Sequence, residues 1–124
     1  MDIHTLRKWI AERDSISTLE IVDVFTGQRT ILHEFDYVIE APNWTRDGRF
    51  LVYNSGGRMY TYALASGEIK EIDTGFAIDC NNDHVLSADN TQLAVSHFTY
   101  QDATSRIYTL PLGGGSPRLV TEKG

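Results

Sequence analysis

Two sequence patterns that recur every 40 to 48 residues constrain the fold of this chain more than any other feature. Residues 59–72 (MYTYALASGEIKEI) align with residues 107–120 (IYTLPLGGGSPRLV) at an offset of 48. Residues 19–32 (LEIVDVFTGQRTIL) align with the first segment at an offset of 40. Each copy reads as a short strand, a turn that contains glycine and a second strand, which predicts a β-hairpin.

A second pattern precedes two of these hairpins. Residues 43–53 (NWTRDGRFLVY) align with residues 85–95 (VLSADNTQLAV) at an offset of 42. In both copies a hydroxyl residue stands two positions before an aspartate, as Thr45 stands before Asp47. Asp-Gly and Asp-Asn tolerate the positive φ of tight turns, and we expect the hydroxyl to brace the turn with a side-chain hydrogen bond.

Together the two patterns describe units of four antiparallel strands at a period near 40 residues. That period is typical of the blades of a β-propeller, whereas a two-layer sandwich has no reason to repeat both patterns at one spacing. We therefore predict an all-β propeller with about two and a half four-stranded blades in this chain. The expected segments are an N-terminal segment at 1–16, with a short amphipathic helix over 2–13, and a partial propeller at 17–124, divided into a half blade at 17–35 and blades at 41–74 and 83–121.

The stretch APNWTRDGRFLVYNSGGRMYTYALASGE resembles the propeller repeat of TolB-like proteins, a WD-repeat-like family with the approximate pattern Pro-x-Trp-Ser-Pro-Asp-Gly, strand, Ile-Tyr, glycine turn. Pro42, Trp44, Asp47, Gly48 and Tyr60 match this pattern. The resemblance covers about residues 17–121 and implies a six-bladed ring. Either the chain is the N-terminal portion of a longer protein, which we favour, or further copies of the chain complete the ring.

Composition limits the partners. The chain has 124 residues, with 11 basic and 17 acidic residues and a net charge of -6, which argues against a nucleic acid or an anionic membrane as partner. Cys80 is the only cysteine, so an intrachain disulfide is impossible. No signal peptide or membrane-spanning run is evident, and we expect a cytoplasmic protein.

The candidate site begins with the stretch CNNDH at 80–84, which we predict to be the connection into the innermost strand of the last blade. The equivalent connection of the preceding blade is YVIEAPN at 37–43. Such connections lie at the mouth of the central channel, where carboxylate, amide and imidazole groups could bind a protein segment or a small ligand. The candidates are Glu40, Asn43, Asn81, Asn82, Asp83 and His84. A purely structural role in turns is the simpler interpretation of the same residues.

Catalysis finds little support, because the sequence contains no nucleophile elbow, phosphate loop, dinucleotide fingerprint or zinc-protease motif. We therefore predict no catalytic residue, no metal site and no cofactor within this chain. The favoured function is a non-catalytic binding or scaffold module that uses its channel mouth or rim to bind a protein or small ligand. The alternative is part of a lyase or hydrolase of carbohydrates or peptides, because similar blades occur in such enzymes.

Overall fold

The fold is a series of short antiparallel strands. The computed structural model describes residues 2–3, 5–6 and 15–122, and the helix predicted over residues 2–13 lies largely outside them. Ten strands run through the described residues: β1 (Ser17–Val22), β2 (Arg29–Phe35), β3 (Glu40–Trp44), β4 (Phe50–Ser55), β5 (Arg58–Ala63), β6 (Ile69–Glu71), β7 (Cys80–Leu86), β8 (Gln92–Thr99), β9 (Thr104–Pro111) and β10 (Arg118–Leu119). Within the described residues, no helix is long and apolar enough to cross a membrane.

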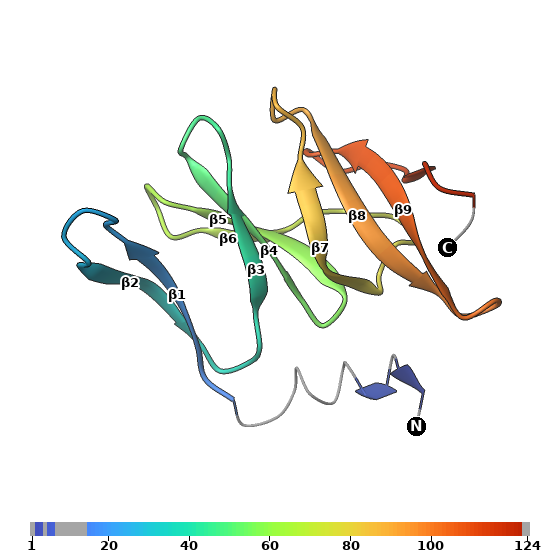
Figure 1. The fold of residues 1–124 in the computed structure, drawn as a ribbon, viewed down its shortest axis with the longest axis horizontal. Coiled ribbons are helices and arrows are strands. Elements are labelled where there is room, and N and C mark those ends of the chain that lie inside the picture. The colour runs from blue at the N-terminus through green and yellow to red at the C-terminus, as the bar shows by residue number, and fades with distance from the viewer. Residues whose placement is uncertain (1, 4, 7–14, 123–124) are drawn as a thin grey trace.

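These strands form three separate sheets that stand side by side (Figure 1). The first, blade 1, is the hairpin β1–β2; the second, blade 2, has the order β3-β4-β5-β6; the third, blade 3, has the order β7-β8-β9-β10. Each sheet follows chain order, so every connection within a blade is a hairpin. The predicted all-β architecture, with two four-stranded blades and a half blade of a propeller, is confirmed.

The aspartate turns form as the sequence predicts. The hydroxyl donates to the aspartate two residues later at 2.7 Å in both blades, Thr45 to Asp47 in blade 2 and Ser87 to Asp89 in blade 3. Asn90 occupies the glycine position of its turn with a φ of 59°. These bonds lower the pKa of both aspartates below the ordinary carboxylate value. Each turn is therefore stabilised by a bond between residues two positions apart, which explains why the repeat can be recognised in the sequence.

Apolar side chains fill the two seams between blades. The seam between blades 1 and 2 contains Leu19, Phe35, Leu51, Tyr53 and Tyr62. The seam between blades 2 and 3 contains Val52, Met59, Ile72, Ala77, Cys80, Leu93, Val95, Tyr108 and Leu110. Each large apolar side chain buried in this way contributes roughly 1.5 to 3 kcal/mol, so the seams hold the blades in place. A blade has no core of its own, and its stability depends on its neighbours.

Two aromatic regions are only partly buried. Trp44 is 51% exposed at the end of β3. In the hairpin between β8 and β9, Tyr100 is 45% exposed, although the hairpin is bonded to its own blade. His97 is buried, and the Tyr100 hydroxyl donates a hydrogen bond to the buried carboxylate of Asp79. That bond joins the hairpin to the segment that enters β7.

Candidate functional site

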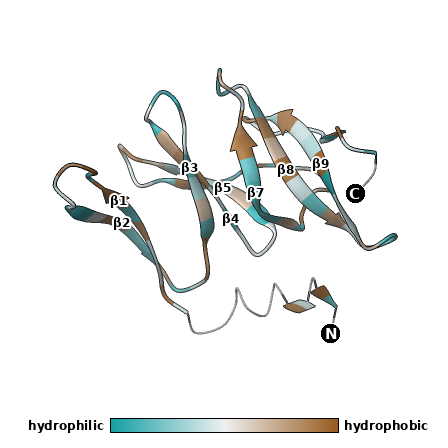
Figure 2. Cartoon of the chain, viewed as in Figure 1, coloured by the Kyte–Doolittle hydropathy of each residue, from teal (hydrophilic) through white to brown (hydrophobic). Residues whose placement is uncertain are grey.

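The stretch CNNDH is not a connection, because the structure places all five residues within β7 itself (Figure 1). Its polar character is visible as a hydrophilic section in the middle of a strand that ends in Val85 and Leu86 (Figure 2). The prediction of a loop was therefore wrong in its secondary structure. The physical reason is that a short polar run gives no strand signal of its own, while its pairing with β8 comes from tertiary context.

The innermost strands of both complete blades have an irregular register at the same point. Along β3, Glu40 pairs with Asn54 and Asn43 pairs with Val52, so three steps on one strand face two on the other. Along β7, four steps from Cys80 to His84 face only two on β8. Such bulges bend a strand and redirect its side chains. Here they turn side chains of the two neighbouring strands toward each other.

A buried polar contact between the blades results, which we call the His84 clasp and which consists of Asn43, Asn54 and His84. The Asn43 amide nitrogen lies 2.9 Å from Nδ1 of His84 and 3.1 Å from its backbone oxygen. On the other side of the ring, Nε2 lies 3.2 Å from Oδ1 of Asn54. His84 is 8% exposed and Asn54 is 2% exposed, so the bond between them is shielded from water, whereas the bonds of Asn43 are partly buried. The clasp joins three strands from two blades.

The chemistry of the partners determines the tautomer of His84. The amide nitrogen of Asn43 can only donate, so Nδ1 of His84 accepts; Nε2 then carries the proton and donates to the Asn54 oxygen. This is a neutral imidazole. Burial lowers the pKa of His84 below its ordinary value of 6.5, which the nearby charge of Asp83 partly opposes. Both ring nitrogens already have partners within the protein.

The structure brings the six predicted residues onto two neighbouring strands, Glu40 and Asn43 on β3 and the other four on β7. Asn81 is engaged, because its amide donates to the Ser96 hydroxyl at 3.0 Å and its oxygen accepts from the Asp83 backbone at 2.8 Å. The side chains of Glu40, Asn82 and Asp83 are exposed. The six therefore divide into residues that hold the strands and residues that face solvent, and their role in binding stays a prediction.

Asn54 belongs to the clasp but was absent from the predicted set. It lies in the buried strand FLVYNS of β4, where Leu51, Val52 and Tyr53 are all buried. A single amide at the end of an apolar run was the available signal, because buried polar side chains need hydrogen-bond partners. The sequence could not name the partner, which lies 30 positions away in the next blade.

Within the part of the chain that the structure describes, no group of three His, Cys, Asp or Glu side chains is arranged to hold a metal ion. What the arrangement offers is two bulged strands joined by the clasp, along which the side chains of Glu40, Asn82 and Asp83 are exposed. Such a surface can form charge-assisted hydrogen bonds to the cationic or amide groups of a partner.

Comparison with known proteins places these features in context. No family model matches the chain. An uncharacterized protein of Agrobacterium fabrum, Atu1656, is 41% identical over 107 residues, which cover 86% of this chain. The Tol-Pal system protein TolB of Francisella tularensis strain WY96-3418 is 32% identical over 100 residues, or 77% of this chain. A solved structure from Agrobacterium tumefaciens, provisionally identified as TolB, matches with a TM-score of 0.79 and 40% identity over 86% of this chain.

These relatives are much longer than the chain. It spans 36% of the A. fabrum protein, 22% of the F. tularensis protein and 38% of the solved structure. The matches support the resemblance to TolB-like proteins that the repeat motif predicts, and they show that the blades correspond to part of a larger molecule in each relative.

Proposed function

We propose, from its similarity to TolB proteins and the geometry of its inner strands, that this chain forms part of a non-catalytic β-propeller that binds a partner protein. The observation that supports this most directly is that some polar residues of β3 and β7 join the two strands while others are exposed to solvent. The His84 clasp holds the strands together, while Glu40, Asn82 and Asp83 on the same two strands are exposed. A surface that is rigid before binding loses little entropy when a partner docks.

The exposed groups determine which partner chemistry fits. Two carboxylates and an amide, on a molecule with a net charge of -6, favour a segment that carries basic side chains or amide donors. Small ligands with the same donors would fit the same groups. We place the contact at the channel end of the innermost strands of blades 2 and 3.

A charge-reversal experiment tests the proposal. The immobilised chain is incubated with an extract of the cells that produce it, and retained proteins are quantified by mass spectrometry. The test variant carries Glu40→Lys and Asp83→Lys, and the control carries Glu34→Lys, which reverses an exposed charge on β2. We expect a discrete protein that the wild type and the control retain and the double variant loses. Equal retention by all three chains would refute this binding surface.

A further inference from the structure

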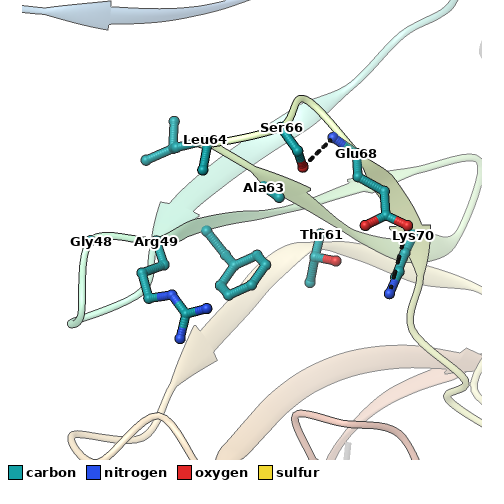
Figure 3. Close-up of a pocket in the computed structure, with 10 residues that line it drawn as sticks. Gly48, Arg49, Thr61, Ala63, Leu64, Ser66, Glu68 and Lys70 are labelled. Carbon is teal, nitrogen blue, oxygen red and sulfur yellow. Dashed lines mark hydrogen bonds and ion pairs between the residues drawn. The ribbon is translucent and has the colours of Figure 1, made fainter.

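A second concave surface lies between blades 2 and 3, away from the innermost strands. A cavity of about 600 Å³ separates the face of blade 2 that carries Phe50 and Thr61 from the turns of blade 3 that carry Thr91 and Leu112. A second cavity, of about 440 Å³, shares Phe50 and Thr61 with the first and extends outward past Arg49 (Figure 3). The two cavities adjoin at these shared lining residues, and we call them together the inter-blade groove. Its principal lining residues are Arg49, Phe50, Thr61, Lys70, Leu112 and Gly113.

The lining of the groove includes a glycine at one hairpin tip, Gly113. In the repeat alignment, Gly113 of blade 3 corresponds to Ala65 in blade 2 and Phe25 in blade 1. A side chain at position 113 would meet no atom within 4 Å, so the space in front of it is empty. Leu112 anchors the tip, because its backbone nitrogen donates to the Thr91 carbonyl at 3.0 Å. A larger side chain at position 113 therefore has room at this lining position, and the Leu112 bond holds the tip in place.

The walls of the groove are held at a fixed separation. Arg46, beside the lining residue Thr45, donates to the backbone oxygen of Ala88 in the facing turn at 2.9 Å. Both turns are also braced internally by their aspartates. The groove is therefore formed before any ligand arrives, as binding sites usually are.

The charges of the groove favour an anionic ligand. The Arg49 guanidinium lies 5.5 Å from the centre of the Phe50 ring, and no described carboxylate forms an ion pair with it. Lys70 is only loosely paired, 3.7 Å from Glu68, and both side chains are mostly exposed. By contrast, Glu71 is already bonded to Arg58 at 2.8 Å. Glu68 and Glu71 line the groove as well, so the cation that stands beside the apolar floor of Phe50, Ile72 and Leu112 without a described ion-pair partner is Arg49, with Lys70 loosely held next to it.

We propose that the inter-blade groove binds an extended peptide segment of a partner protein in which aliphatic and acidic side chains alternate. Its aliphatic side chains would cover the floor, and its carboxylates would bond to Arg49 and Lys70. The hydroxyl of Thr61 stands along the groove, where it can bond to a peptide backbone, and that of Thr91, whose proton is donated to Asp89 at 2.7 Å, can still accept a hydrogen bond. In an extended peptide successive side chains point to opposite sides, so one segment can serve both the floor and the rim. The remaining negative charge of the molecule would repel acidic peptides elsewhere on its surface.

Fluorescence anisotropy with labelled, end-capped peptides tests this on the 124-residue chain. The probes are Glu-Leu-Asp-Leu-Glu, its basic counterpart Lys-Leu-Lys-Leu-Lys and the acidic but polar Glu-Ser-Asp-Ser-Glu. We expect the acidic–aliphatic peptide to bind at least about tenfold tighter than either of the others, and its affinity to fall as salt rises. Equal binding of all three, or a preference for the basic peptide, would overturn the proposal.

Variants locate the binding. We expect Arg49→Glu with Lys70→Glu to weaken the acidic–aliphatic peptide roughly tenfold or more, because the attraction becomes repulsion. Gly113→Phe adds a large side chain at a lining position and should weaken binding to a similar extent, while the circular dichroism spectrum stays that of the wild type, since a Cβ there meets no atom within 4 Å. Arg118→Glu is the matched charge control on β10, and Glu40→Lys with Asp83→Lys alters only the other proposed surface. Both controls should bind within about twofold of the wild type. Unchanged binding by the Arg49/Lys70 variant or by Gly113→Phe would place the peptide elsewhere and refute the groove.

Discussion

At the scale of single residues, His84 carries the connection between the two complete blades. Its ring nitrogens bond to Asn43 on β3 and Asn54 on β4, so one imidazole ties β7 to two strands of the preceding blade. Protonation would place a second N–H against the amide nitrogen of Asn43, which has no acceptor to offer. The clasp therefore requires the neutral ring.

This requirement predicts a dependence of stability on pH. Burial lowers the pKa of His84 in the folded chain below the value of 6.5 that it has when unfolded. Between the two values the unfolded chain binds more protons, so the stabilisation is complete above 6.5 and is lost as the pH falls through the folded value. His97 has a pKa lowered by burial as well and acts in the same direction. Urea unfolding from about pH 8 to about pH 5 measures the effect.

The variant His84→Gln distinguishes the contribution of the clasp to the pH dependence from that of His97. We expect it to lower the free energy of unfolding by roughly 1 to 3 kcal/mol near pH 8, because it disturbs a buried hydrogen-bond pair. The difference from the wild type should shrink as the pH falls below 6.5, because the unfolded wild-type chain then binds a proton that the folded chain excludes from His84. His33→Gln in blade 1 is the control. A difference that stays constant with pH would mean that the clasp does not depend on the neutral ring.

At the scale of elements, the hairpin between β4 and β5 supports the start of β7. Gly57 accepts a hydrogen bond from the backbone nitrogen of Cys80 at 2.8 Å, and its φ is 88°. A Cβ built on Gly57 would lie 2.4 Å from the backbone oxygen of Ile78 and 3.0 Å from the Cα of Asp79. The backbones of the two blades thus touch at a point where a side chain has no room.

We therefore expect Gly57→Ala to destabilise the chain by about 3 kcal/mol or more, because a backbone clash adds to the strain of positive φ. Gly27→Ala is the matched control, since Gly27 has a φ of 74° but a Cβ there would meet nothing within 4 Å. It should cost only about 1 kcal/mol, for the strain alone. Urea unfolding followed by tryptophan fluorescence compares them. Similar losses of unfolding free energy for the two variants would show that the segment before β7, at Ile78 and Asp79, moves aside to make room for the new side chain.

The same elements show what the sequence could and could not predict. The aspartate turns and glycine hairpins were predictable because Thr45 and Asp47 bond to each other two positions apart. The entry of residues 80–84 into β7 was not, because its bulged pairing depends on β8. Nor was the clasp, whose three members lie 30 and 41 positions apart along the chain. Local bonds leave a sequence pattern, whereas contacts between blades leave only isolated polar residues.

At the scale of the whole molecule, the repeat alignment relates residues buried between blades 2 and 3 to residues on the face of blade 3 that points away from blade 2. The positions of Val52 and Met59, which are fully buried between blades 2 and 3, correspond in the next repeat to Ala94 and Ile107. The latter line a shallow cavity together with Val85, which is 59% exposed. The face of blade 3 that points away from blade 2 thus has the apolar chemistry of a blade–blade seam.

This correspondence predicts how the 124-residue chain behaves in solution by itself. Apolar faces of this kind, left uncovered, drive association, so we expect its apparent mass in light scattering to rise with protein concentration. Val85→Lys with Ile107→Lys should reduce the rise, because charges are costly to bury against another apolar face. Gln92→Lys with Arg118→Gln leaves the apolar face of blade 3 unchanged and should associate like the wild type. An apparent mass of the wild type that does not depend on concentration would contradict this prediction. It would mean that another part of the protein covers this face of blade 3, which then does not associate as a blade–blade seam does.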